Sequence, residues 1–95
     1  MTRVEKHRQI CEHLTKVYEQ KNTDYGNSFG DTFNKLGIIS AVTRISDKCN
    51  RLCSLATKSE EERLVKDESI KDTLLDLANY AIMTLIAIED EKVIK

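Results

Sequence analysis

The chain has no proline and no tryptophan, and only three glycines in 95 residues. Proline breaks helices and glycine weakens them, so few residues here can interrupt a helix. We therefore predict an all-α fold with a helix content far above the usual third.

Charge of one sign is also absent. The net charge is −1, which excludes the overall basic field typical of proteins that bind DNA or RNA. The hydrophobic share of 40% and the charged share of 33% indicate a globular helical protein and exclude a disordered one. At this length we predict a single helical domain over residues 1–95, small enough that self-association would help to stabilise it.

Targeting and membrane signals are missing from the sequence. The N-terminal residues MTRVEKHRQ contain no apolar stretch of the kind found in signal peptides. The apolar run over 74–88 is too short and too polar for a transmembrane helix. We therefore predict a cytoplasmic protein without a membrane partner. Its three cysteines form no CxxC motif and are predicted to be reduced residues of the core.

The first half of the chain predicts one long helix and one short one. Thr2 and Glu5 have the spacing of a capping box, so the first helix should start there and end near Lys21. The segment Lys21–Asp31, KNTDYGNSFGD, is rich in turn residues and predicts a loop. Asp31 is expected to cap a short helix that runs through Leu36 and ends at Gly37.

The second half predicts two further helices. Apolar residues recur at helical spacing from Ile38 to Ala56. A charged connection over Ser59–Lys66 should lead to a last helix over Ser69–Asp90. The result is a helical bundle of three main helices plus a short helix carried by the loop. The last helix has more apolar faces than a three-helix monomer can cover, so we predict a homo-oligomer, a dimer or larger.

Polar residues interrupt this last, apolar helix on one stripe. They are spaced so that they face the same way on a helix, and a carboxylate among apolar neighbours needs a cation, a metal ion or a ligand as its partner. The stripe consists of Glu68, Asp72, Asp76 and Asn79. The alternative is a structural salt bridge from Arg44 or Arg51 to Asp76.

Two further polar groups accompany the stripe. The helix over Ile38–Ala56 carries Arg44, Asp47, Lys48 and Arg51, whose cationic groups suit phosphate. A simple surface ion pair between Asp47 and Arg51 is the alternative. The predicted loop carries Lys21, Asn22, Asp24 and Tyr25, next to Gly26 and Asn27. Tyr25 is either a stacking platform for a base or a plug at the end of the bundle.

A ligand that uses cations, carboxylates and an aromatic ring together is a nucleotide. The predicted ligand-binding residues are Lys21, Asn22, Asp24, Tyr25, Arg44, Lys48, Arg51 and Asn79. The chain has no glycine-rich phosphate loop, so side chains would have to hold any phosphate. No Ser/His/Asp or Cys/His nucleophilic set can be recognised, and no catalytic residue is assigned.

Three motifs, KNTDYGNSF, RISDKCNRL and DESIKDTLLDLANYAIM, occur in this order. Together they resemble the nucleotide modification associated domain (type 1), a small bacterial and phage family. The resemblance extends from Tyr18 to Ile88 and implies nucleotides and phage biology, hence the host cytoplasm as the location if the gene is phage-encoded. It implies no established reaction.

A weaker resemblance links the chain to the all-α nucleoside triphosphate pyrophosphohydrolases of the MazG and dimeric dUTPase type. Their Mg²⁺ ions lie between an ExxE motif and an ExxD motif on two helices. Glu68, Asp72 and Asp76 could stand for the second motif, although at i, i+4 spacing, and Asp24 or Asp47 could complete the metal shell. The first motif is missing, since its helix offers only Asp47 beside Lys48 and Arg51.

Three functions therefore remain open at this point. The first is a nucleotide-binding protein that sequesters a signalling nucleotide of host defence; no cofactor is assigned to it with certainty, and Mg²⁺ is possible. The second is a Mg²⁺-dependent nucleoside triphosphate pyrophosphohydrolase, in which Glu68, Asp72 and Asp76 would bind the metal. The third is a structural helical oligomer without a ligand, in which the polar residues form ion pairs.

Overall fold

The computed structural model describes residues 1–57 and 63–94. These residues form four helices and no strand: α1 (Arg3–Tyr25), α2 (Ser28–Leu36), α3 (Ile38–Ala56) and α4 (Arg63–Ile94). The prediction of an all-α fold with three long helices and one short helix is confirmed. None of the helices in the described part of the chain is long and apolar enough to cross a membrane.

The first helix begins as predicted but ends later. Thr2 and Glu5 form a capping box, in which each side chain accepts a hydrogen bond from the other's backbone N–H. The predicted end near Lys21 is wrong, because the helix continues to Tyr25 and stops only at Gly26. The Gly26 N–H donates to the carbonyl of Asn22 at 2.8 Å. Nothing before this glycine prevents the helix from continuing.

The predicted loop over Lys21–Asp31 is therefore also wrong. Only Gly26 and Asn27 separate α1 from α2, and Asn27 rather than Asp31 is the N-cap of α2, accepting a hydrogen bond from the N–H of Gly30 at 3.3 Å. The sequence pattern predicted a loop from its asparagine and glycine residues, but these residues serve as helix caps. Asp31 lies in the first turn of α2, where a carboxylate interacts favourably with the helix dipole.

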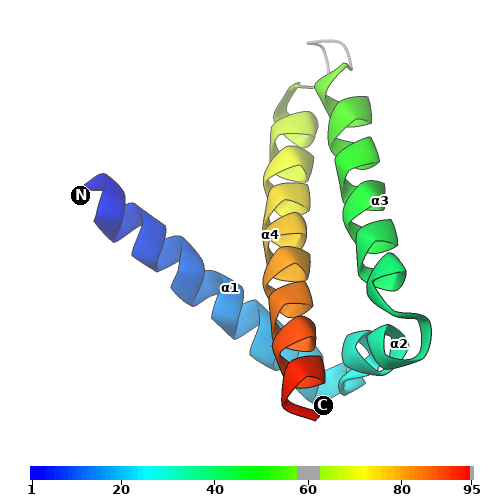
Figure 1. The fold of residues 1–95 in the computed structure, drawn as a ribbon. Helices are drawn as coiled ribbons and strands as arrows, with labels where there is room; N and C mark the ends of the chain where they lie inside the picture. The colour runs from blue at the N-terminus through cyan, green and yellow to red at the C-terminus, as the bar shows by residue number, and fades with distance from the viewer. Residues whose placement is uncertain (58–62, 95) are drawn as a thin grey trace.

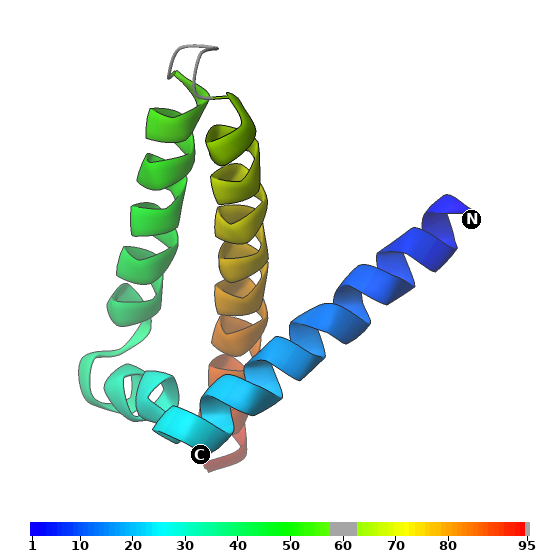
Figure 2. The same ribbon diagram turned by 180° about the vertical axis from the view of Figure 1, so that it is seen from behind.

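Helices α3 and α4 form an antiparallel pair that is the main body of the chain (Figures 1 and 2). The bounds predicted for α3 are confirmed. Gly37, with φ of 76°, ends α2 as predicted, and its N–H donates to the carbonyl of Phe33 at 2.7 Å. α4 is longer than the predicted Ser69–Asp90. Of the predicted charged connection, 59–62 lie outside the described residues and 63–66 belong to α4.

The core lies where α2 packs against the α3–α4 pair. Phe33 and Ala41, only 3% and 0% exposed, form a cluster with Ala87, and Phe29 and Ile88 pack against it. Helix α2 lies across the lower end of α3 and α4 (Figure 1). This core joins α2 to the facing sides of the two long helices.

Helix α1 extends away from this body (Figures 1 and 2). The Cα radius of gyration is 15.5 Å, whereas a compact domain of this length has about 12 Å. α1 contacts α4 mainly through its C-terminal half, where Leu14 is buried. The N-terminal half, including Val4 and Ile10, is exposed.

The single chain buries less than the sequence pattern predicted. Helix α4 was expected to be the most buried helix, yet several of its large apolar side chains are more than 40% exposed: Leu74, Ile82, Leu85 and Ile86. The prediction of core cysteines is wrong as well, because the free thiols of Cys11, Cys49 and Cys53 are all in exposed residues. The apolar residues of α3 cover more of its surface than one neighbouring helix can bury, so some of them stay exposed.

Candidate functional site

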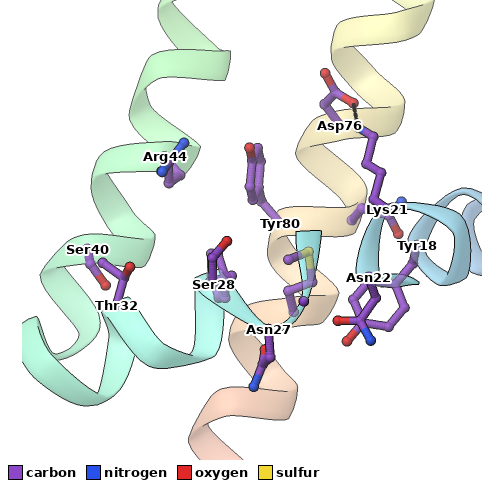
Figure 3. A pocket seen from close by; sticks show the side chains of 14 residues that line it. Tyr18, Lys21, Asn22, Asn27, Ser28, Thr32, Ser40, Arg44, Asp76 and Tyr80 are labelled. Carbon is purple, nitrogen blue, oxygen red and sulfur yellow. Dashed lines mark ion pairs between the residues drawn. The ribbon is translucent and has the colours of Figure 1, made fainter. Parts of the chain in front are cut away.

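A cleft of about 220 Å³ lies where the end of α1, the start of α2 and the facing sides of α3 and α4 meet. Figure 3 shows side chains from all four helices directed toward it. The lining residues are Tyr18, Lys21, Asn22, Gly26, Asn27, Ser28, Phe29, Thr32, Ser40, Arg44, Asp76, Asn79, Tyr80 and Met83.

The sharp connection between α1 and α2 forms one end of the cleft. Gly26 has φ of 69° and ψ of −162°, a conformation that is essentially restricted to glycine. It ends α1 and lets Asn27 start α2 immediately. Gly30 makes this cap possible, because a Cβ there would lie 2.5 Å from the Nδ2 atom of Asn27. Tyr18 and Lys21 of α1 and Ser28 and Phe29 of α2 thus line the same cleft.

Asp76 is shared by two lysines from different helices. Its Oδ2 lies 3.2 Å from the Nζ of Lys48 on α3, and its Oδ1 lies 3.7 Å from the Nζ of Lys21 on α1. The alternative predicted from sequence, a salt bridge from Arg44 or Arg51, is not what the structure contains. The side chain of Asp76 is 37% exposed, against 27% for Lys48 and 61% for Lys21. The carboxylate is therefore neutralised without being sealed from solvent.

Arg44 is the other cation that lines the cleft. Its side chain lies on α3, above Ser40 and Thr32 in the view of Figure 3, and lines the cleft. No carboxylate of the described residues forms an ion pair with it. An exposed guanidinium with five N–H donors, beside neighbouring hydroxyl groups, is suited to bind a phosphate or a carboxylate of a ligand.

Aromatic rings line the cleft between the charged groups. Tyr80 of α4 stacks on Phe29 of α2, with ring centroids 5.9 Å apart and an interplanar angle of 29°. In the view of Figure 3, the Tyr80 ring stands between Arg44 and the Lys21–Asp76 pair, and Tyr18 approaches from α1. Such rings can stack with a nucleobase.

Sequence reasoning missed these aromatic residues. A signal for Tyr80 was present, because it lies four residues after Asp76 and therefore on the same stripe of α4. Phe29 and Tyr18 had no comparable signal, since their part in the cleft depends on the turn at Gly26 and Asn27. The stacking residue predicted from sequence is Tyr25 instead, whose side chain lies outside the described part of the structure.

The fold brings only some of the other predicted ligand-binding residues to the cleft. Lys21, Asn22, Arg44 and Asn79 line the cleft, and Lys48 reaches it through Asp76. Asn79 also donates from Nδ2 to the carbonyl of Leu14 at 3.2 Å, which ties α4 to α1. Arg51 donates from Nε to the hydroxyl of Thr73 at 3.2 Å and is not in the cleft lining. Asp24 is exposed and does not line the cleft either.

The predicted metal-binding residues do not converge. Glu68 and Asp72 are exposed on α4, and both oxygens of Asp76 face lysines. Among the residues that the structure describes, no group of three His, Cys, Asp or Glu side chains could hold a metal ion. This donor set does not fit a Mg²⁺ site, which requires several oxygen ligands around one point.

Comparison with known families matches residues 21–88 to the model of the nucleotide modification associated domain 1. The chain belongs to this family. The resemblance based on the three sequence motifs is thus confirmed. Every lining residue of the cleft except Tyr18 lies inside the segment matched by the nucleotide modification associated domain 1 model. No curated protein and no solved structure matches the chain.

Proposed function

We propose that this protein binds a nucleotide in the cleft between α1, α2, α3 and α4. The observation that carries this proposal is the combination of Arg44, a cation without a carboxylate partner among the described residues, with the stacked rings of Tyr80 and Phe29 in one cleft. A phosphate needs the first group and a base needs the second. The membership in a family whose description refers to nucleotides agrees with this assignment.

In this proposal the phosphate binds to Arg44, and the hydroxyls of Ser28 and Thr32 supply further hydrogen-bond donors, whereas the Ser40 hydroxyl already donates to the carbonyl of Gly37 at 2.9 Å. Lys21 contributes from α1, because its exposed and loosely paired ammonium group can reorient toward a ligand. The base stacks at the aromatic side chains, an interaction worth roughly 1–3 kcal/mol per base.

We propose capture of the nucleotide rather than its hydrolysis. Two lysines already neutralise Asp76, and the acidic residues required for a Mg²⁺-dependent pyrophosphohydrolase lie apart on the surface of α4. A protein that holds a nucleotide without converting it would lower its free concentration. Sequestration of a signalling nucleotide of host defence, by a protein encoded by a phage, is the role that we propose for such capture.

Self-association is part of the same proposal. Apolar side chains are exposed on both α3 and α4, among them Ile39, Val42, Leu74 and Leu85. Exposed apolar surface of this extent marks an interaction surface in soluble proteins. We therefore propose that copies of the chain associate through these faces.

Incubation of the protein with a nucleotide panel and Mg²⁺, followed by chromatography of the bound and free fractions, tests the proposal. We expect stoichiometric retention of an unchanged nucleotide that is released on heating. Arg44→Gln should weaken retention strongly, whereas Arg8→Gln, on the exposed half of α1, should not. Conversion to a product would support the hydrolase, and no retention of any nucleotide would support a structural oligomer.

A further inference from the structure

Asp76 is the one carboxylate among the residues that line the described cleft. Its side chain extends into the same space as Lys21 (Figure 3) and stays 37% exposed. A carboxylate at this place opposes the binding of any anion, since like charges repel across a few ångströms. A cleft that only attracts anions gains nothing from a carboxylate at this position, so its presence calls for a reason.

The two lysines offset this repulsion only in part, because one of them is loosely held. The Lys48 Nζ is close, at 3.2 Å, whereas the Lys21 Nζ is at 3.7 Å and its side chain is 61% exposed. An anion that recruits Lys21 would therefore have to draw it away from Asp76. A compact anion is attracted by the cations but has few hydrogen-bond donors to offer to the carboxylate.

We propose that Asp76 determines the specificity of the site by rejecting compact anions and accepting ligands that also carry hydrogen-bond donors. This inference rests on the proposed nucleotide site. The ribose hydroxyls and the amino or imino groups of a purine are such donors, and a carboxylate accepts hydrogen bonds from them strongly. Inorganic phosphate at neutral pH is a mixture of H2PO4− and HPO4²−, so it carries one or two negative charges on a small ion and fewer O–H and N–H donors than a purine nucleotide. Asp76 would thus keep abundant inorganic phosphate out of the cleft.

The competing explanation is that Asp76 is a structural clip that holds α1 against α4 through Lys21. The two explanations predict different results. A clip affects the melting temperature and weakens all ligands together. A specificity-determining carboxylate changes the relative affinities for two probes in a protein that remains folded.

The test compares Asp76→Asn with Asp72→Asn, which removes the same charge one turn earlier on α4 but outside the cleft. Inorganic phosphate and guanosine monophosphate are titrated separately by calorimetry into both variants and the parent chain. In Asp76→Asn we expect phosphate to bind about tenfold more tightly, as removal of one nearby negative charge predicts. The ratio of guanosine monophosphate affinity to phosphate affinity should fall by at least the same factor. Asp72→Asn should leave both affinities within twofold of the parent values.

An unchanged phosphate affinity in Asp76→Asn would overturn the proposal, and so would an equal gain in Asp72→Asn. Failure of Asp76→Asn to fold would also overturn it, because the side chain would then be structural. Asp76→Glu keeps the negative charge, so this variant should keep the parent chain's preference for guanosine monophosphate over phosphate. Loss of that preference in Asp76→Glu would also overturn the proposal. The phosphate titration tests the role of Asp76 even if the parent chain binds no nucleotide. Absence of nucleotide binding in the parent chain would count against the proposed function and not against the role of Asp76.

Discussion

Lys48 and Asp76 connect α3 to α4 beside the cleft, with Nζ and Oδ2 3.2 Å apart. The pair explains how an acidic residue can be accommodated within the most apolar stretch of the chain. The carboxylate is compensated by a cation from the neighbouring helix and, more loosely, by Lys21 from α1. The same contact positions the charged part of the cleft relative to its aromatic part.

Replacement of Asp76 by alanine should affect binding more than stability. Its ion pairs are partly exposed, and pairs of this kind contribute about 0–1 kcal/mol. We therefore expect the melting temperature to fall by no more than about 8 °C, as 1 kcal/mol shifts a domain of this size by roughly 4–8 °C. Retention of the nucleotide should be lost. A sharp drop in melting temperature with normal binding in the folded fraction would instead show that Asp76 is a structural residue.

Arg44→Gln should weaken nucleotide binding without affecting the fold. A hydrogen bond to a charged group contributes about 1.5–3 kcal/mol, which corresponds to a loss of affinity of roughly 10- to 150-fold. Stability should hold because Arg44 is exposed and has no ion pair among the described residues. Calorimetric titration and thermal unfolding of the same sample measure both quantities. Equal affinity in Arg44→Gln and the parent chain would remove Arg44 from the site.

Tyr80→Ala should remove the stacking surface, whereas Tyr80→Phe should preserve it. Loss of one stacked base costs about 1–3 kcal/mol of binding free energy. The alanine variant also loses the contact with Phe29, so its stability should fall as well. The phenylalanine variant separates the two effects, since it keeps the ring and lacks only the hydroxyl. If it binds as poorly as the alanine variant, the hydroxyl rather than stacking is responsible for binding.

Gly26→Ala should destabilise the protein by about 1–3 kcal/mol, since the backbone conformation of Gly26 is strained for any residue with a Cβ. Space is not the cause, because a Cβ at this position would meet nothing within 4 Å. Asn34→Ala, at an exposed helical position of α2, is the control and should change stability little. Chemical denaturation of both variants measures the difference. Equal stabilities would mean that the turn between α1 and α2 tolerates another conformation.

The parent chain should behave as a dimer or larger oligomer in light scattering at micromolar concentration. Leu85 is 61% exposed in the single chain, so Leu85→Glu should cost a monomer little but should dissociate an assembly that buries this face. Lys71→Glu, at an exposed polar position on the same helix, is the control and should leave the assembly intact. A parent chain that is monomeric at this concentration would end the prediction.

The helices themselves were accessible from sequence because their signals are local. The capping box at Thr2 and Glu5, the stop at Gly37 and the apolar spacing from Ile38 to Ala56 each depend on residues only a few positions apart. The error at the end of α1 has the same local origin. Asparagine, aspartate and glycine occur both in loops and in helix caps, and composition alone does not distinguish a loop of eleven residues from two residues between two helices.

The sequence by itself thus determined the helical class, the start of α1, the end of α2, both ends of α3 and the presence of an acidic residue that needs a partner. Only the tertiary structure decided which partners it has. Lys21 and Lys48 rather than Arg44 face Asp76, and Tyr80 rather than a loop residue meets Phe29. The physical reason is that helix formation depends on neighbours within one turn, whereas a cleft depends on how four helices pack. That packing is set by the turn at Gly26 and Asn27 and by contacts such as the one between Asn79 and Leu14, 65 residues apart.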